Sequence, residues 1–253
     1  MKKYAVITGA SSGIGKEFAK ILANKDYSLI LIARRENHLI ELKKTLNTEC
    51  EIITCDLSHE DECYLLCEKI KDKKIDIFIN NAGFGDCGSF LHTDIHKEIN
   101  MINVNIKALH ILTKFIIQHM QQNNNGYLLN VSSSAGLMPC GPYMATYYAT
   151  KSYVTSFTCA IAKELKDKKS QVYIGCLCPG PVNTEFNHIA NVQFALKGIS
   201  ASYCAKYALK KMFQRKTIIV PTFKMKIATT LNRFLPRSLC IYIVSHQQKR
   251  KLQ

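Results

Sequence analysis

A tyrosine and a lysine close together on one helix can pass a proton to or from a reacting oxygen. Residues 132–151 read SSSAGLMPCGPYMATYYATK and hold three serines, two adjacent tyrosines and a lysine. Tyr147 lies four residues before Lys151 and Tyr148 lies three before it, and both spacings share a helix face with the lysine. A nearby ammonium lowers the pKa of a phenol, which is about 10 when free. The spacing therefore predicts a tyrosine acid beside Lys151 but does not choose between the two tyrosines.

A glycine-rich turn follows the first apolar segment of the chain. YAVIT at 4–8 predicts a buried strand, and TGASSGIG at 8–15 leads from it into a segment with helical spacing. Three glycines in such a turn let bare backbone approach a diphosphate, while the helix N-terminus supplies N–H donors. The spacing differs from the general G-x-G-x-x-G pattern, so on its own it also fits a plain strand-to-helix turn.

Apolar runs alternate with helical segments along the rest of the chain. This pattern predicts an α/β fold with a doubly wound, seven-stranded parallel sheet, Rossmann-like, with helices on both faces. Ser58 is the expected cap of the third helix. The expected strands are 4–8, 28–33, 51–57, 75–83, 126–133, 172–180 and 217–221, and the expected helices include 14–24, 39–46, 60–71, 95–121 and 144–166.

The net charge of +15 is unevenly distributed. From Phe186 onward there are 13 Lys or Arg and no Asp or Glu, so the first 185 residues carry 21 basic against 19 acidic residues, or +2. No nucleic-acid-binding module accompanies this charge, so no nucleic acid partner is expected. Residues 223–251 mix apolar and basic residues, and Pro236 should divide them into two helices. They either rest on an anionic membrane surface, or form a helix pair that closes a substrate pocket or a subunit contact.

The eleven cysteines do not form pairs of C-x-x-C knuckles. Free, buried thiols in a reducing cytoplasm are expected, with no metal site. No uninterrupted apolar run reaches the length of about 18 residues that a membrane span needs, and the segment MKKYAVITGA is too short for a secretory signal. The expected location is cytoplasmic, with peripheral membrane association as the open alternative.

Four motifs together resemble the short-chain dehydrogenase/reductase family: TGASSGIG (8–15), NNAG (80–83), YYATK (147–151) and PGPVNTEF (179–186). The resemblance implies one domain over 1–253, and a homodimer or homotetramer joined through two long helices. Within it, 1–185 would be the dinucleotide-binding and catalytic body, 186–222 the substrate cover and last strand, and 223–253 a basic amphipathic C-terminal extension.

The family motif Tyr-x-x-x-Lys selects Tyr147 with Lys151. The resemblance also implies a serine beside the substrate oxygen. Counting back from Tyr147 by the family's usual spacing gives Ser134, whereas matching VSSSAG to the family's text gives Ser133. An extra residue in the loop MPCGP, such as Cys140, would account for the difference, and Ser133 is favoured.

Asn105 matches the family's helix asparagine, whose backbone carbonyl holds a water that links the lysine to bulk solvent. Asp56 matches the position that accepts a hydrogen bond from the adenine amino group, although it could instead cap the following helix. Asn80 matches a turn that flanks the adenine ribose, although it could instead stabilise the sheet edge.

Two arginines follow the second strand, where many NAD-dependent relatives have Asp or Glu. A guanidinium suits a 2′-phosphate, so NADP(H) is expected and NAD(H) is the weaker candidate, with Arg34 preferred over Arg35. The backbone of Val182 and the hydroxyl of Thr184 are expected at the nicotinamide carboxamide. The complete expected cofactor site is Gly9, Ser11, Ser12, Gly13, Ile14, Gly15, Arg34, Arg35, Asp56, Leu57, Asn80, Ala82, Gly83, Tyr147, Lys151, Pro179, Gly180, Val182 and Thr184.

These expectations describe an NADP(H)-dependent oxidoreductase that interconverts a carbonyl and a secondary alcohol. The predicted cover is apolar, which suits a hydrophobic substrate, and a steroid or bile-acid hydroxyl and a 3-oxoacyl lipid both remain open. A catalytically inactive NADP(H)-binding regulator is the alternative. The Tyr147–Lys151 pair argues against it, because a protein that only binds the cofactor does not need the tyrosine. The apolar residues of the cover are Phe186, Ile189, Val192, Phe194 and Leu196.

Overall fold

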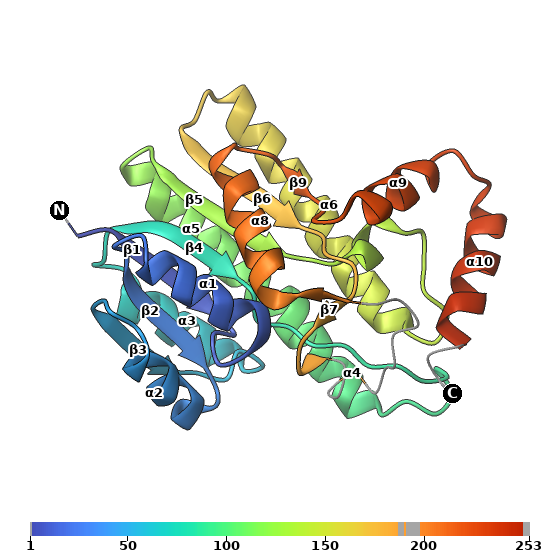
Figure 1. The fold of residues 1–253 in the computed structure, drawn as a ribbon, viewed down its shortest axis with the longest axis horizontal. Helices are drawn as coiled ribbons and strands as arrows, with labels where there is room; N and C mark the ends of the chain where they lie inside the picture. Colours follow the sequence, from blue (N-terminus) through green and yellow to red (C-terminus); the bar gives the residue numbers. More distant parts are fainter. Residues whose placement is uncertain (1, 187–189, 191–197, 250–253) are drawn as a thin grey trace.

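A computed structural model describes residues 2–186, 190 and 198–249 of the chain (Figure 1). It contains the predicted seven-stranded parallel sheet, in the order β3-β2-β1-β4-β5-β6-β9, and a separate two-stranded sheet. The large sheet comprises β1 (Tyr4–Thr8), β2 (Ser28–Ala33), β3 (Cys50–Thr54), β4 (Ile75–Asn80), β5 (Gly126–Val131), β6 (Val172–Leu177) and β9 (Ile218–Ile219), and the small sheet comprises β7 (Val182–Asn183) and β8 (Ile199–Ser200). Several predicted strands end earlier in the structure, because the polar, glycine and proline residues after them leave the ladder and form loops.

Helices cover both faces of the large sheet, as predicted. On one face lie α1 (Gly13–Ala23), α2 (Glu36–Lys44) and α8 (Ala201–Phe213), and on the other lie α3 (Glu60–Ile70), α5 (Leu109–Gln122) and α6 (Ala145–Asp167). Successive strand residues alternate between the two cores: Ala5 and Ile7 pack with α1, whereas Val6 packs with α3 and α5. The sheet is therefore buried on both sides, which explains why its strands are apolar throughout.

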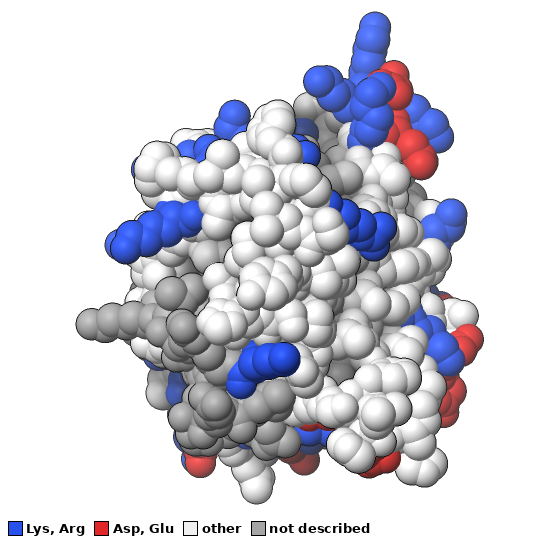
Figure 2. Space-filling view, turned by 90° about the vertical axis from the view of Figure 1, so that its right-hand side faces the viewer, with Lys and Arg blue, Asp and Glu red and all other residues white. Residues whose placement is uncertain are grey.

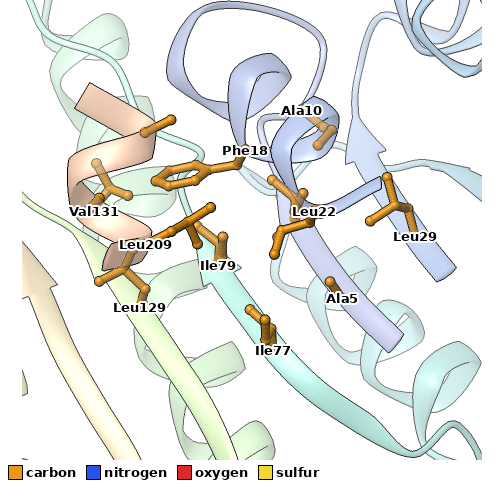
Figure 3. Packing of buried hydrophobic residues seen from close by; sticks show 14 of the residues in the cluster. Ala5, Ala10, Phe18, Leu22, Leu29, Ile77, Ile79, Leu129, Val131 and Leu209 are labelled. Carbon is orange, nitrogen blue, oxygen red and sulfur yellow. The ribbon is translucent and has the colours of Figure 1, made fainter. Parts of the chain in front are cut away.

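The core between α1, α8 and the sheet fixes the start of α1 (Figure 3). Phe18 of α1 is completely buried, and it lies among Leu209 of α8, Ile79 of β4 and Val131 of β5. Because α1 begins directly after the glycine turn, this packing also holds the turn at the carboxyl edge of the sheet. That edge, where the strand order reverses between β1 and β4, is where open α/β sheets bind ligands.

The helix predicted over 95–121 is interrupted. It consists of α4 (Ile95–Ile102), a π-helical segment η1 (Asn103–Ala108) and α5. Single π turns inside α-helices are rare and often occur at functional sites. Here the wide turn accompanies a buried asparagine, Asn105, whose side chain bonds to neighbouring segments of the chain.

The predicted cap of α3 is wrong by one residue. The N-cap is His59, whose side chain makes no capping hydrogen bond. Ser58 instead donates to Oδ1 of Asp56, from its backbone N–H at 3.0 Å and from its hydroxyl at 2.8 Å. The carboxylate of Asp56 thus closes a tight local turn before the helix and does not cap it.

The last part of the described chain forms α9 (Phe223–Leu231) and α10 (Arg237–Lys249), divided before Pro236 as predicted. None of the helices in the described ranges is long and apolar enough to cross a bilayer. All eleven cysteines are free thiols, in agreement with the prediction from their spacing.

Candidate active site

The glycine turn between β1 and α1 makes a close approach that only glycine allows. Gly9 and Gly13 have φ angles of 65° and 54°, in the left-handed region. A Cβ on Gly9 would lie 2.9 Å from Cα of Ala82, and one on Gly15 would lie 2.3 Å from the carbonyl oxygen of Gly9. The turn is therefore folded tightly against the end of β4, and the first amides of α1 face the cleft at the sheet edge.

Two arginines after β2 lie at the rim of this cleft and already have acidic neighbours. Arg35 donates to Glu185 at 2.8 Å and to the hydroxyl of Ser11 at 3.4 Å. The hydrogen bond and charge of Arg35 lower the pKa of Glu185. Arg34 is more exposed and pairs only loosely with Asp56, at 3.9 Å. Of the two guanidinium groups, that of Arg34 has the weaker existing partner and is therefore the more available to an anion.

Asp56 is held as an anion. Partial burial opposes its ionisation, but hydrogen bonds from Ser58 and the charge of Arg34 outweigh that effect and lower its pKa. Its carboxylate can therefore accept a hydrogen bond from a ligand amino group at the rim.

The structure separates the two asparagines of NNAG. Asn80 is 3% exposed and donates to Thr113 and Asn130 inside the core, at 3.1 and 3.0 Å. Its side chain does not line the cleft. Asn81, which the sequence analysis did not select, lines it and donates to the carbonyl oxygens of Thr8 and Gly9 at 3.0 and 3.1 Å. The end of β4 explains the difference, because Asn80 is the last residue of the strand and Asn81 begins the loop along the cleft.

The tyrosine and lysine of α6 meet at the same edge. Tyr147 is 8% and Lys151 5% exposed, and the ammonium nitrogen lies 5.8 Å from the centroid of the tyrosine ring. The ammonium also donates to the carbonyl oxygen of Val131, at the end of β5, at 3.0 Å. Gly83 lets it approach, since a Cβ there would lie 3.2 Å from the lysine nitrogen.

The pKa values of this pair differ from the prediction. Burial raises the pKa of Tyr147 to about 12, an effect that the nearby hydroxyl of Ser133 only partly offsets. Burial likewise lowers the pKa of Lys151 to about 8. The expected acidic phenol is thus not a property of the protein alone, because desolvation disfavours the charged form of both groups.

The adjacent serines have different surroundings. Ser133 lines the cavity with Tyr147, and its hydroxyl lowers the pKa of that phenol. It also accepts from the N–H of Ala135 at 3.1 Å, at the start of the short helix η2 (Ser134–Leu137). Ser134 donates its backbone N–H to Pro179 at 2.7 Å. Ser132, not selected from the sequence, holds α6 by donating to the carbonyl oxygen of Lys151 at 2.8 Å.

Asn105 connects the loop after β4 with the catalytic helix. It is fully buried, accepts from the N–H of Phe84 at 3.1 Å and donates to the carbonyl of Phe84 at 2.8 Å. It also donates to Thr150 at 3.1 Å, one residue before Lys151. Its side chain is therefore structural, and the π turn that contains it lies beside Gly83 and the lysine.

One cavity of about 620 Å³ joins the turn, the rim and the tyrosine. Three expected site residues do not line it: Gly15, Asn80 and Asn105. Beyond Tyr147 its walls are largely apolar, and part of them comes from α9 and α10, as expected if residues 223–251 form a helix pair that closes a pocket. The expected residues that line it are Gly9, Ser11, Ser12, Gly13, Ile14, Arg34, Arg35, Asp56, Leu57, Ala82, Gly83, Ser133, Tyr147, Lys151, Pro179, Gly180, Val182 and Thr184.

Of the predicted substrate cover, Phe186 contacts the Tyr147 ring, with centroids 5.5 Å apart. Ile189, Val192, Phe194 and Leu196 lie outside the described residues. The cleft can accommodate a nicotinamide dinucleotide: a glycine cradle and helix N-terminus for the diphosphate, two arginines and a carboxylate at the rim, and a lysine beside the reacting end.

A family model described as short chain dehydrogenase matches residues 3–193. The chain belongs to the short-chain dehydrogenase family. The enzymes described below are its relatives, and the activity in each name belongs to that relative.

Curated relatives include reductases of lipids and steroids. A very-long-chain 3-oxoacyl-CoA reductase from Neurospora crassa is 35% identical over 180 residues, covering 68% of this chain and 54% of that protein. Another from Kluyveromyces lactis is 31% identical over 242 residues, covering 90% and 62%. A 17-beta-hydroxysteroid dehydrogenase type 3 from Mus musculus is 31% identical, covering 76% and 64%. The chain thus spans little more than half of the length of these relatives.

Solved structures share the fold. A short-chain dehydrogenase from Sphingobium yanoikuyae in complex with NADPH has a TM-score of 0.82 at 24% identity, covering 92% of this chain and 94% of that one. A metagenomic short-chain oxidoreductase in complex with NADP has a TM-score of 0.74 at 25% identity, covering 87% and 98%. A further structure, from Burkholderia phymatum, is a complex with NAD, with a TM-score of 0.82 at 23% identity, covering 91% and 92%.

Proposed function

We propose that this short-chain dehydrogenase interconverts a carbonyl and a secondary alcohol on a hydrophobic molecule, with NADP(H) as the redox cofactor. The observation that carries the proposal is the pairing of Tyr147 with the buried Lys151, in the same cavity as Ser133, at the edge of the sheet that bears the glycine cradle. The cofactor supplies or accepts the hydride. A site that only bound the dinucleotide would not need a phenol at this position, which argues against the alternative of an inactive regulator.

In the proposed mechanism the substrate oxygen lies between the hydroxyls of Ser133 and Tyr147. In reduction, Tyr147 gives its proton to the oxygen as the carbonyl carbon becomes an alcohol carbon, and Ser133 stabilises the developing charge by hydrogen bonding. In oxidation, the tyrosine takes the proton back.

Lys151 supports this step in two ways. Its ammonium stabilises the phenolate of Tyr147 once a proton has left, and it can hold the ribose of the cofactor. The π turn supports a route for proton replacement, because its altered hydrogen bonding makes the carbonyl of Asn105 a candidate for holding a water near the lysine.

NADP(H) is favoured over NAD(H) by the charge at the rim. Arg34 and Arg35 follow β2 where a carboxylate would be needed to bind a ribose hydroxyl. We assign the 2′-phosphate to Arg34, because Arg35 already has a close partner in Glu185.

A hydrophobic substrate is supported by the apolar walls beyond Tyr147. Phe84, Met138, Met144 and Phe186 line this part of the cavity. Relatives named for 3-oxoacyl-CoA and for hydroxysteroids are consistent with such a substrate, and both classes remain candidates. NADPH oxidation at its absorbance band, followed with a panel of apolar ketones, tests the proposal. Turnover supports it, and cofactor binding without turnover of any ketone would favour the inactive regulator.

We further propose that the chain is one domain and that α5 and α6 join copies of it into a homodimer or homotetramer. An aromatic cluster spans the two helices: the His110 and Phe157 rings stack at 4.7 Å, and His110 hydrogen-bonds to Tyr153 at 2.6 Å. Sedimentation of the protein at micromolar concentration should show a dimer or tetramer. A monomer would contradict this assignment.

The helix pair α9–α10 is proposed to bind the surface of an anionic membrane with its outer side. Phe223, Phe234 and Tyr242 are 77%, 80% and 73% exposed. Figure 2 faces this side of the molecule and shows Lys and Arg scattered over a largely uncharged surface. Aromatic side chains among cations, in a segment without acidic residues, complement anionic headgroups. The inner side of the same pair lines the cavity with Met225 and Val244, so closing the pocket and contacting a bilayer are compatible roles.

Vesicle flotation tests this surface. The protein should float with phosphatidylserine vesicles and not with phosphatidylcholine vesicles. The double variant Phe223→Ser, Phe234→Ser should have a vesicle partition coefficient about tenfold lower than that of the wild type. Tyr64→Ser, at an exposed aromatic residue of α3 on the opposite side of the molecule from α10 (Figure 1), is the control. Equal flotation of the double variant and the wild type would refute the assignment.

A further inference from the structure

The side chain of Gln248 enters the cavity from the last turns of α10. It is 2% exposed and lines the same cavity as Tyr147. Its Nε2 donates to the hydroxyl of Tyr148 at 2.5 Å, a contact between residues 100 positions apart. The C-terminal helix is thereby fastened to the catalytic helix directly beside the reacting tyrosine.

The other atom of this amide is unsatisfied. Oε1 of Gln248 is buried and has no hydrogen-bond partner within the described ranges, a state that it shares there only with Oδ1 of Asn100. Buried acceptors nearly always have a partner, and an unpaired one in a cavity indicates a group that arrives with a ligand or water. Fastening the amide to Tyr148 also fixes the direction in which its carbonyl points.

Tyr148 is itself held rigidly. A Cβ on Gly141 would lie 2.2 Å from its ring, so the ring packs directly on the backbone of the loop before α6. The rings of Tyr147 and Tyr148 meet edge to face, with centroids 6.3 Å apart. The Gln248 amide thus occupies a fixed place beyond the reacting tyrosine, on the wall that α10 supplies.

The neighbouring parts of that wall are apolar. Met144 and Val244 are buried and line the cavity with Gln248. An acceptor in apolar surroundings discriminates strongly, because a ligand without a donor leaves it unpaired while a ligand with one satisfies it. Such a site favours ligands with a hydrogen-bond donor over otherwise similar ligands without one.

We propose that Oε1 of Gln248 accepts a hydrogen bond from a hydroxyl or N–H group of the substrate, at a position remote from the reacting carbonyl. The inference rests on the proposed function, because it assumes that the substrate carbonyl lies at Tyr147. It narrows the substrate class to an apolar molecule with the carbonyl at one end and a hydrogen-bond donor at the other.

Two matched ketones test the subsite: phenylcyclohexanone and its para-hydroxyphenyl analogue. Their binding is measured by calorimetry with NADP⁺ present, because the oxidised cofactor cannot reduce a ketone. The wild type should bind the hydroxyl analogue about tenfold more tightly, and Gln248→Met should bind both ketones equally. Gln118→Met, the same change at an exposed residue of α5 that does not line the cavity, should keep the preference.

A second variant distinguishes loss of the acceptor from misfolding of the protein. Gln248→Glu keeps an acceptor at the same reach and should retain a preference for the hydroxyl analogue, whereas Gln248→Met should lose it. Equal binding of the two ketones by the wild type would overturn the subsite. An unchanged preference in Gln248→Met would also overturn it, because the preference would then not come from Oε1 of Gln248. Turnover of the plain ketone with NADPH is measured separately, so failure of the proposed function is distinguishable from failure of the subsite.

Discussion

The ammonium of Lys151 lies 5.8 Å from the centre of the Tyr147 ring, and both side chains are withdrawn from solvent. Burial raises the pKa of the tyrosine to about 12 and lowers that of the lysine to about 8. Each group therefore resists ionisation in the protein alone. At neutral pH Lys151 still carries its charge, whereas Tyr147 keeps its proton. The proposed chemistry therefore needs the bound cofactor and substrate to make the phenol more acidic.

The lysine makes stability depend on pH. Between pH about 8 and 10.5, the unfolded chain still holds the Lys151 proton that the folded protein has released, so stability rises with pH. Below about 8, the full penalty of burying the charge is present, on the order of 3 kcal/mol. Lys151→Met removes it. In urea titrations without cofactor, the stability of the variant relative to the wild type should fall as pH rises through this window, and a constant difference would contradict the buried-charge assignment.

Gly83 leaves the space that the Lys151 ammonium occupies. A Cβ at this position would lie 2.9 Å from Oδ1 of Asn105 and 3.2 Å from the Lys151 nitrogen. Gly83→Ala should therefore lower kcat about tenfold or more, and it should also lower the free energy of unfolding by about 1 kcal/mol or more, because buried Asn105 must shift. Gly88→Ala, whose Cβ would meet only a methyl group of Thr93, is the control. Steady-state kinetics that show equal kcat for the two variants would argue against a catalytic need for this approach.

The serines offer a direct comparison. Ser133→Ala removes the hydroxyl proposed to bind the substrate oxygen and should lower kcat by about 100-fold, as loss of one charge-stabilising donor does in other enzymes. Ser134→Ala should have a small effect, since the backbone N–H that binds Pro179 remains. The reverse order of the two kcat values would assign the catalytic hydroxyl to Ser134.

The arginines should control cofactor choice. Arg34→Ala is expected to lower kcat/KM for NADPH about tenfold or more and to leave the value for NADH nearly unchanged. Arg35→Ala should have a smaller effect, because Arg35 is engaged with Glu185. The ratio of kcat/KM for NADPH to kcat/KM for NADH measures the cofactor preference of each variant. A larger change of this ratio in Arg35→Ala than in Arg34→Ala would place the 2′-phosphate at Arg35.

Local patterns were sufficient for the sheet and for most of the cleft. Strands buried on both faces read as unbroken apolar runs, and the glycine turn needs no distant information because its backbone conformation excludes other residues. The repeat of one helix likewise places a tyrosine beside Lys151, but it does not choose between Tyr147 and Tyr148, and the resemblance to the motif Tyr-x-x-x-Lys made that choice.

Features that depend on contacts between distant parts of the chain could not be predicted from local sequence patterns. The π turn at 103–108 interrupts a segment with ordinary helical periodicity, and it accompanies hydrogen bonds from Asn105 to Phe84 and Thr150. Gln248 reaches Tyr148 from the far end of the sequence. The choice of Asn81 over Asn80 depends on how far β4 extends, which the sequence overestimated.

The central claim is that the hydroxyl of Tyr147 transfers the proton. Tyr147→Phe keeps the ring against Phe186 and removes only that hydroxyl, so NADPH should bind with nearly unchanged affinity. The most direct measurement is single-turnover oxidation of bound NADPH by a reactive ketone, compared between the wild type and this variant. The account predicts a loss of rate of at least about 100-fold, whereas a rate within about twofold of the wild type would contradict it.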